Sequence, residues 1–306
     1  MKRIKRISSE KNPFYRYSEW ILIAPFIICF VVFILLPVLA AVVLSFTKFD
    51  SVQFPQFVGL KNYIDIFSND RQFFQKVLPN TIIYAVIVGP GGYMLSFILA
   101  WILGQLTRWP RTILAIVFYS PSLLGSVALT TIWSVIFSGD RNGYLNNLLL
   151  SMNIINEPIT WLTSTETLMP IMIFVALWSS MGVGFLAMLS GILNVDHELY
   201  EAAYIDGVKN RFQEIYYITI PATKPQLLFG AVMAIINTFN SPGLGVALSG
   251  SNPTPNYAGQ LIVNHMDDYG FLRYEMGYAS ALSVVLLVIV WFASKIAYRL
   301  FEDKDS

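Results

Sequence analysis

Six long stretches of the chain contain no Asp, Glu, Lys or Arg, and they define its organisation. They cover residues 20–47, 77–107, 112–139, 167–195, 225–266 and 276–294. A helix needs about 20 apolar residues to cross the hydrocarbon core of a bilayer, and each stretch reaches that length or falls just short of it. The pattern therefore predicts an all-α membrane protein with six transmembrane helices.

Two of these stretches need separate interpretation. The fifth is too long for one helix, but from Ser241 onward it fills with Gly, Pro, Ser and Asn, which favours a helix followed by an outer loop. The first follows a basic segment, as in a signal peptide. Its apolar run from Trp20 to Phe46 is far longer than the roughly 7–15 apolar residues of a signal peptide. We expect it to be retained as a transmembrane helix.

The positive charges predict the orientation of the helices. Of the 20 Lys and Arg residues, 14 lie in the two terminal segments and in the second and fourth connections, and 6 lie in the other three connections. Positive residues accumulate on the cytoplasmic side, so both termini are expected there. The expected layout is a cytoplasmic segment 1–19, a six-helix transmembrane domain 20–300 with spans at about 20–46, 78–106, 112–137, 168–193, 225–248 and 276–298 and a cytoplasmic loop 194–224, and a cytoplasmic tail 301–306.

The composition limits the classes of function. Only 13% of the residues are charged and the net charge is +1, so nothing indicates a nucleic-acid partner. The single cysteine, Cys29, lies in an apolar run and is expected to be a small buried apolar side chain. Both histidines, His197 and His265, lie outside the predicted spans, and neither a metal-ligand cluster nor a nucleophile–base pair can be assembled. The chain is not expected to be an enzyme.

Energy coupling is the next question. Apart from Lys295 at the cytoplasmic end of the last one, the predicted spans contain no fixed charge. Proton- or sodium-coupled transporters usually use such a charge to bind the driving ion, although backbone carbonyls alone can bind sodium. There is also no Gly-x-x-x-x-Gly-Lys-Ser/Thr phosphate loop, so the chain does not hydrolyse ATP by that mechanism. If the protein pumps a solute, another polypeptide supplies the energy.

The cytoplasmic loop 194–224 has a helix–turn–helix pattern. Asp196 is a suitable N-cap and Gly207 a suitable left-handed C-terminal residue for a first helix, while Asn210 with Gln213 resembles a capping pair for a second. Leu199, Ala202, Ala203 and Asp206 share one face of the first helix. On this pattern alone, a docking element and an interfacial hairpin that covers the bundle are equally supported.

The loop resembles the EAA loop of binding-protein-dependent ABC importer permeases. The resemblance rests on Glu201-Ala202-Ala203, on Gly207 after three intervening residues, and on Ile218-Thr219-Ile220-Pro221. It implies that this loop is the coupling helix that docks on the ATP-hydrolysing subunit, through Glu201, Ala202, Ala203, Asp206 and Gly207. The chain departs from the family pattern in two ways: one extra residue follows the glycine, and Ile220 precedes Pro221 where the family prefers Leu.

The resemblance continues along most of the chain, towards the maltose-type permease of the sugar and glycerol-phosphate uptake class. The matching segments are Ser45-Phe46-Thr47, Phe57 to Tyr63, Asn80-Thr81, Tyr119-Ser120-Pro121, Gly143 to Asn146 and Gly277 to Ala281. It implies a type I ABC importer fold in a bacterial cytoplasmic membrane. The implied partners are a homologous second permease, two ATP-binding cassette subunits that hold ATP and Mg, and an extracytoplasmic solute-binding protein. The implied substrate is a sugar or oligosaccharide.

Recognition of a sugar requires hydrogen-bonding side chains and aromatic faces. Asn237 and Asn240 lie three residues apart in the fifth span, and the resemblance places this region at the substrate pocket. Trp178, Met181 and Gly184 of the fourth span are further candidates, although amides and glycines in spans also serve helix packing. Three alternatives stay open: a glycerol-phosphate or polyol permease of the same class, an ion-coupled secondary transporter or channel, and a regulatory subunit that carries nothing.

Overall fold

The computed structural model describes residues 13–239 and 243–301. Their regular secondary structure is helical apart from one short antiparallel strand pair, β1 (Thr47–Lys48) with β2 (Gln56–Phe57). Four helical segments are long and apolar enough to cross a membrane: Leu22–Leu44, Phe73–Gly104, Leu168–Leu193 and Met276–Arg299. Two bent helix pairs raise the number to six when each pair is counted as one span. The expectation of an all-α membrane protein is confirmed.

The elements follow the chain as a series of long helices joined by shorter ones. The first half contains α1 (Pro13–Phe30), η1 (Val31–Leu35), α2 (Leu36–Leu44), β1, β2, α3 (Lys61–Ile64), η2 (Asp65–Asn69), η3 (Phe73–Val77), α4 (Leu78–Gly104), α5 (Arg108–Leu123), α6 (Ser126–Ile136) and α7 (Tyr144–Ser151). The second half contains α8 (Leu168–Trp178), α9 (Val183–Leu193), α10 (His197–Ile205), α11 (Arg211–Glu214), η4 (Ile215–Thr219), α12 (Ile220–Ala222), α13 (Lys224–Phe239), α14 (Leu244–Ser249), η5 (Pro255–Tyr257), α15 (Ile262–Asp267), η6 (Asp268–Leu272) and α16 (Met276–Phe301).

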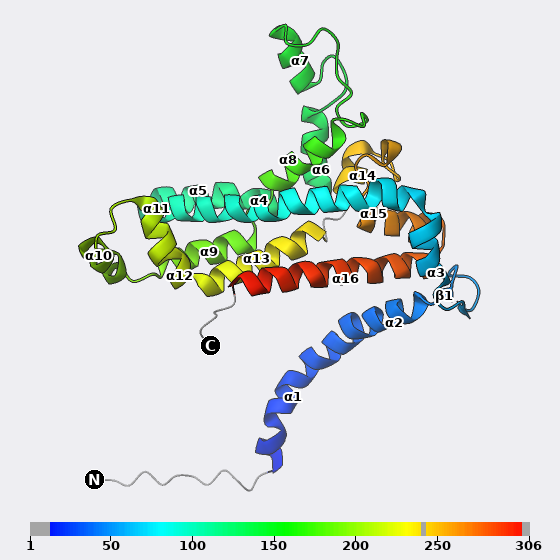
Figure 1. Ribbon diagram of the computed structural model, residues 1–306, viewed down its shortest axis with the longest axis horizontal. Helices are drawn as coiled ribbons and strands as arrows, with labels where there is room; N and C mark the ends of the chain where they lie inside the picture. The colour runs from blue at the N-terminus through cyan, green and yellow to red at the C-terminus, as the bar shows by residue number, and fades with distance from the viewer. Residues whose placement is uncertain (1–12, 240–242, 302–306) are drawn as a thin grey trace.

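The long helices α4 and α16 run along the length of the bundle, as do α5, α9 and α13 (Figure 1). The loop with α10 and the loops with β1 and α3 lie at opposite ends of the bundle (Figure 1). The positive charges assign the α10 end to the cytoplasm and the β1 end to the outside. Loops that are far apart in sequence thus meet at the same side of the membrane.

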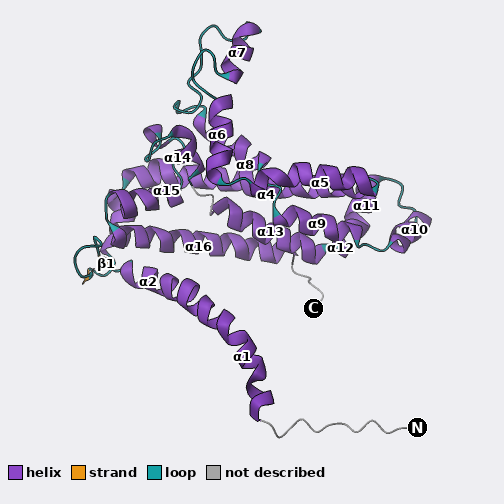
Figure 2. Ribbon diagram, turned by 180° about the vertical axis from the view of Figure 1, so that it is seen from behind, coloured by secondary structure: helices purple, strands orange, loops and turns teal. Residues whose placement is uncertain are grey.

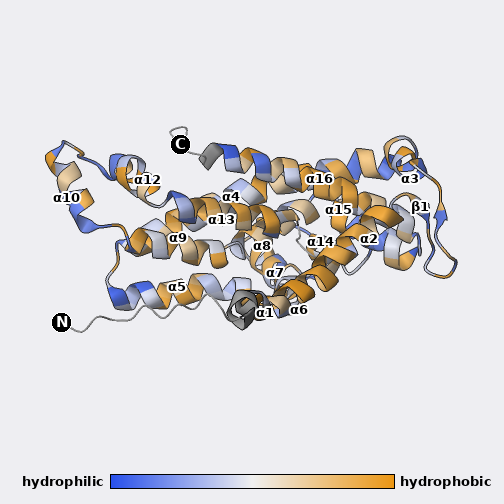
Figure 3. Cartoon of the chain, turned by 90° about the horizontal axis from the view of Figure 1, so that it is seen from below, coloured by the Kyte–Doolittle hydropathy of each residue, from blue (hydrophilic) through white to orange (hydrophobic). Residues whose placement is uncertain are grey.

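The first span stands apart from the bundle over most of its length (Figure 2). None of its most apolar window within Leu22–Leu44 is buried by the rest of the chain, and its residues are mostly hydrophobic (Figure 3). Cys29, which was expected to be buried, is exposed within this chain. Its packing against the bundle comes from α2 against α16. The first span therefore buries its side chains in lipid or in other subunits rather than in this chain.

Two spans are bent. In the third, α5 meets α6 at 98°. In the fifth, the cytoplasmic segment Arg211–Ala222 meets α13 at 86°, so the second half of the cytoplasmic loop leads directly into a membrane helix. The 16 residues of α13 rise about 24 Å. Residues 240–242, which follow α13, lie outside the described part of the chain.

Three amide side chains organise the loops at the outer end, of which Asn62 and Asn146 are buried and Asn80 is partly buried. Asn62 donates to the carbonyls of Ser45 at 2.8 Å and Thr47 at 2.9 Å. Asn80 donates to the carbonyl of Tyr257 at 2.7 Å, and Asn146 bridges several carbonyls of the loop 138–166. These side chains satisfy loop carbonyls that would otherwise be buried without a partner. Each lies in a segment on which the family resemblance rests.

Gly277 at the start of α16 packs directly on the end of the first span. A Cβ at this position would overlap the carbonyl oxygen of Thr47 and lie 3.2 Å from the amide nitrogen of Phe49. We expect Gly277→Ala to lower the stability of the chain by roughly 1–3 kcal/mol through overpacking, measured as thermal unfolding of the purified protein in detergent. Gly125→Ala is the control, since a Cβ there has no neighbour within 4 Å; an equal loss in both variants would contradict the packing argument.

Candidate functional site

A cavity of about 500 Å³ lies inside the bundle, between α4, α5, α8, α9 and α13. Its walls include the places where the third and fourth spans are interrupted. Leu124 and Gly125, between α5 and α6, have extended backbone angles, and residues 179–182 separate α8 from α9. An interrupted helix leaves backbone groups without their usual partners, and such backbone is tolerated at membrane depth where it lines a cavity.

The side chains around this cavity are polar but uncharged, aromatic or aliphatic. The polar and aromatic ones are Tyr84, Tyr93, Ser96, Tyr119, Ser122, Thr130, Ser179, Ser180, Phe185, Asn237 and Thr238. No Asp, Glu, Lys, Arg or His is among the described residues that line it. Hydroxyl and amide groups both donate and accept hydrogen bonds, and tyrosine rings add apolar faces. The cavity is therefore suited to an uncharged ligand with many hydroxyl groups.

The substrate-site residues predicted from the sequence fall into three groups. Asn237 and Gly184 line the cavity. Trp178 packs edge-on against Trp133, with ring centroids 5.2 Å apart, and Met181 is 7% exposed in an apolar cluster with Phe185. Asn240 lies outside the described residues. The structure thus brings two of the predicted residues to the cavity and places Trp178 and Met181 in apolar packing.

The tyrosines and serines that make up most of the polar lining are not among the substrate-site residues predicted from the sequence. Tyr119 and Ser122 flank Pro121, and Ser179 and Ser180 precede Gly182. Proline next to serine, and a Ser-Ser-x-Gly sequence within an apolar stretch, are signals of an interrupted helix. These sequence signals could have predicted the interruptions of the third and fourth spans.

The glycines of the second span serve packing rather than an interruption. The helix α4 continues through Pro90 from Leu78 to Gly104. A Cβ on Gly91 would lie 3.2 Å from Leu177, and one on Gly92 would lie 2.9 Å from Ser180. The absence of side chains at these glycines lets the break in the fourth span lie against α4, so the second span supports the cavity wall.

The cytoplasmic loop forms the two short helices that its sequence predicts. The carboxylate of Asp196 accepts a hydrogen bond from the Glu198 amide at 3.1 Å, as an N-cap of α10. Gly207 has φ +97°, and the amide of Val208 donates to the carbonyl of Ala203 at 3.0 Å, which is the Schellman pattern for a helix end. The prediction of caps at both ends of α10 is confirmed.

The second helix, α11, begins with a reciprocal pair of caps. The side chain of Asn210 accepts from the Gln213 amide at 2.8 Å, and the side chain of Gln213 accepts from the Lys209 amide at 3.0 Å. Between this loop and the ends of α4 and α9 lies a second cavity of about 570 Å³, lined on the loop side by His197, Tyr200, Glu201 and Tyr204 among others. The loop is therefore well ordered by local contacts, yet α10 is held away from the bundle.

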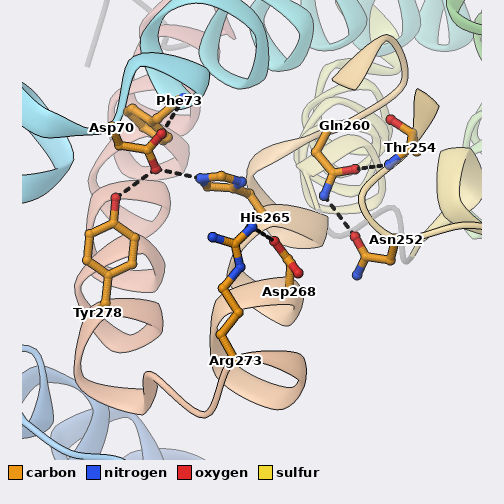
Figure 4. A network of polar contacts seen from close by, with 9 residues as sticks. All are labelled: Asp70, Phe73, Asn252, Thr254, Gln260, His265, Asp268, Arg273 and Tyr278. Carbon is orange, nitrogen blue, oxygen red and sulfur yellow. Dashed lines mark hydrogen bonds and ion pairs between the residues drawn. The ribbon is translucent and has the colours of Figure 1, made fainter. Parts of the chain in front are cut away.

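At the outer end, a carboxylate joins three segments (Figure 4). The Oδ2 atom of Asp70 lies 2.8 Å from Nε2 of His265 and accepts a hydrogen bond from the hydroxyl of Tyr278 at 2.8 Å. Its Oδ1 atom accepts from the amide of Phe73 at 2.9 Å. Burial alone raises the pKa of Asp70, but the bonds from His265, Phe73 and Tyr278 outweigh it and lower the pKa to about 2. The carboxylate thus remains ionised at neutral pH.

Two further polar contacts stabilise the loop 249–275 at this end. Asp268, which is 3% exposed, pairs with Arg273 at 2.6 Å, and Gln260 binds the Thr254 amide and the Asn252 side chain at 2.9 Å each (Figure 4). This loop is one of the connections predicted from the sequence to face outward. Within it Asp268 and His265 are buried, so the outer loop is a packed cap on the bundle.

The profile of one protein family matches residues 92–304 of the chain. The family is described as "Binding-protein-dependent transport system inner membrane component". The chain belongs to this family. It is therefore a multi-pass component of the cytoplasmic membrane and a transport subunit rather than an enzyme, as the EAA loop and the charge-free spans predict.

Relatives from this class of transporter match three quarters or more of the chain. The probable ABC transporter permease protein YesP of Bacillus subtilis (strain 168) is 31% identical over 300 residues, covering 98% of this chain and 93% of that protein. The arabinooligosaccharides transport system permease protein AraP of the same organism is 29% identical over 96% of this chain and 92% of its own length. The lactose transport system permease protein LacF of Rhizobium radiobacter is 32% identical over 75% of each chain.

A solved structure of this transport class shares the fold. The crystal structure of a bacterial ABC transporter involved in import of the acidic polysaccharide alginate contains a chain that superposes with a TM-score of 0.76, covering 95% of this chain and 98% of that one. The sequence identity is 23%. The predicted ABC importer permease fold is confirmed.

Among the described residues, no group of three or more His, Cys, Asp or Glu is placed to hold a metal ion.

Proposed function

We propose that this permease subunit carries an uncharged sugar or oligosaccharide through the 500 Å³ cavity. The observation that supports this most directly is the lining, which presents hydroxyl, amide and aromatic groups but no charged side chain among its described residues. The named substrates of two relatives, arabinooligosaccharides and lactose, agree with this chemistry. A glycerol-phosphate is disfavoured, because burying its phosphate without a cation is costly. An uncharged polyol remains compatible with the cavity.

Other subunits deliver the substrate and supply the energy for its transport. A solute-binding protein presents the sugar at the outer end, a homologous second permease completes the path, and two cassette subunits bind ATP and Mg. A structure of the alginate transporter in complex with its periplasmic protein supports the first of these partners. The alternative of an ion-coupled transporter lacks a fixed charge in the described cavity lining.

Coupling is assigned to α10 and the turn that follows it. Glu201, Ala202, Ala203, Asp206 and Gly207 form this element, and the small side chains let another surface approach closely. Because Arg211–Ala222 continues into α13 at an 86° bend, movement of α10 and α11 is transmitted to a wall of the cavity. ATP-driven closure of the cassette subunits then changes the side on which the cavity opens.

Asn237 provides the test of the cavity. Replacing it by leucine removes a hydrogen-bonding group from the lining, so the apparent affinity for the transported sugar should fall roughly 5–10-fold. The measurement is uptake of radiolabelled sugar by the assembled importer in proteoliposomes, with Asn69→Leu in an outer loop as the matched control. Unchanged uptake in the Asn237 variant would show that the substrate does not pass through this cavity. Because the described lining has no charged side chain, neutral sugars should compete with the radiolabelled sugar for uptake, and the corresponding uronic acids should not.

A further inference from the structure

Three serines lie where the third and fourth spans are interrupted, and all three line the 500 Å³ cavity. Ser122 lies in the last turn of α5, and Ser179 and Ser180 directly follow α8. A Cβ on Gly182, the N-cap of α9, would lie 3.9 Å from the Cβ of Ser122. The two interruptions therefore meet at one place in the cavity wall. These three serines are called the serine cluster below.

The proton of each hydroxyl in the serine cluster is used within the chain itself. Each hydroxyl bonds a carbonyl three or four residues earlier: Ser122 that of Tyr119 at 2.8 Å, Ser179 that of Val175 at 3.0 Å and Ser180 that of Leu177 at 2.8 Å. A carbonyl oxygen can only accept, so in each pair the hydroxyl donates. Serine side chains in helices commonly bond the backbone in this way.

The three serine oxygens can therefore accept a hydrogen bond from a ligand but have no proton left to donate. A hydroxyl carries one proton and two lone pairs, and no described residue donates to these oxygens. All three serines are partly exposed. A hydroxyl that already donates also becomes a stronger acceptor. A ligand group that binds the serine cluster must bring its own proton.

This requirement separates groups that a ligand could present. The hydroxyl groups of a sugar can donate to the serine oxygens. Ether oxygens, carboxylates and carbon-bound fluorine carry no proton, so their lone pairs would face those of the serines. Asn237 and Tyr119 also line the cavity, but an amide and a phenol can each donate and accept. Among these groups, the serine cluster is the part of the lining that selects for donors.

We infer that the serine cluster is a specificity element, which recognises the substrate through the protons of its hydroxyl groups. This inference rests on the proposed function, since it takes the substrate to be a neutral sugar that passes through the cavity. The interruptions of the third and fourth spans place the three acceptors together. A sugar that loses a contacted hydroxyl proton is then transported more slowly, even when its size and ring are unchanged.

Uptake of fluorinated sugars tests the serine cluster. The probes are neutral disaccharides, each used as the native sugar and as analogues in which fluorine replaces one hydroxyl group. Uptake rates are measured in proteoliposomes that contain the assembled importer, at saturating sugar and binding protein. We expect the native importer to transport at least one analogue roughly fivefold more slowly than its parent sugar, as for the loss of one neutral hydrogen bond.

Alanine variants assign this preference to the serines. Ser122→Ala and Ser179→Ala each remove one acceptor. In at least one of them the parent sugar should slow roughly fivefold while the analogue does not slow further, so the preference disappears. The matched control is Ser283→Ala in α16. This serine donates to the carbonyl of Ser280 at 2.7 Å and lies outside the described lining, so its variant should keep the native preference.

The outcomes separate the serine cluster from the proposed function. If the native importer transports every analogue as fast as its parent sugar, the serine cluster does not recognise hydroxyl protons and the inference is overturned. It is also overturned if both alanine variants keep the native preference, or if they slow parent and analogue equally, as a merely structural role would. In these cases the assignment as a sugar importer stands. If no neutral sugar is taken up at all, the proposed function itself fails.

Discussion

Asp70→Ala is expected to lower the stability of the chain by roughly 2–4 kcal/mol, since buried partners are left without their acceptor. The carboxylate serves His265, Tyr278 and the Phe73 amide together. The side chains of His265 and Asp70 are 1% and 7% exposed, so water cannot replace the lost bonds. The measurement is thermal unfolding in detergent, followed by recovery of the chain in the assembled importer.

A graded set of variants tests this interpretation. Tyr278→Phe removes one of the bonds and should cost about 1 kcal/mol. Asp65→Ala, at a partly exposed carboxylate that accepts a hydrogen bond from the nearby Asn69 side chain at 2.7 Å, should cost at most about 0.5 kcal/mol. If Asp70→Ala unfolds at the same temperature as the Asp65 variant, the three segments are not held together by this contact.

The same carboxylate gives a pH dependence with a defined sign. Its pKa is lowered from 3.8 to about 2 in the folded chain. A carboxylate with a lowered pKa contributes stability that is present above its unfolded value and is lost as the pH falls towards its folded value. The difference in unfolding temperature between the native chain and Asp70→Ala should therefore be constant from neutral pH to about pH 5 and shrink below it. A difference that grows on acidification would contradict the assignment.

Much of the fold was predictable because membrane constraints act on local sequence. A transmembrane helix requires a charge-free stretch long enough to cross the bilayer. The helix caps at Asp196, Gly207 and Asn210 depend on neighbours within five residues. For this reason the caps could be placed before the structure was known. The bends between α5 and α6 and ahead of α13 were not predicted, because helix direction depends on tertiary packing that periodicity does not encode.

The outer network could not be predicted, since its members are distant in sequence. Asp70 and His265 are 195 residues apart, and an acidic residue in a polar loop gives no local sign of burial. The substrate candidates show a similar limit. Asn237 and Trp178 both lie in predicted spans, but only Asn237 lines the cavity, while Trp178 packs edge-on against Trp133. Which side of an apolar helix faces the path is decided by its neighbours.

Gly207→Val is expected to reduce sugar uptake roughly 10-fold or more while the chain still reaches the membrane. Gly207 has φ +97°, a conformation that costs a β-branched residue about 1–3 kcal/mol. The strain would be relieved by a change in the turn between α10 and α11. This turn sets the position of α10 relative to the segment that leads into α13. Movement of the cassette subunits would therefore no longer be transmitted to the cavity.

The matched control is Gly207→Asn, because asparagine tolerates left-handed backbone far better than valine. Uptake by the asparagine variant should stay within roughly threefold of the native importer, since the strain is less than 1 kcal/mol. ATPase activity of each assembled complex is measured alongside uptake. Loss of uptake with continued ATP hydrolysis in the valine variant indicates uncoupling. Equal loss of uptake in both variants would instead mean that the open surface at Gly207, where a Cβ meets nothing within 4 Å in the isolated chain, is itself covered by the cassette subunit.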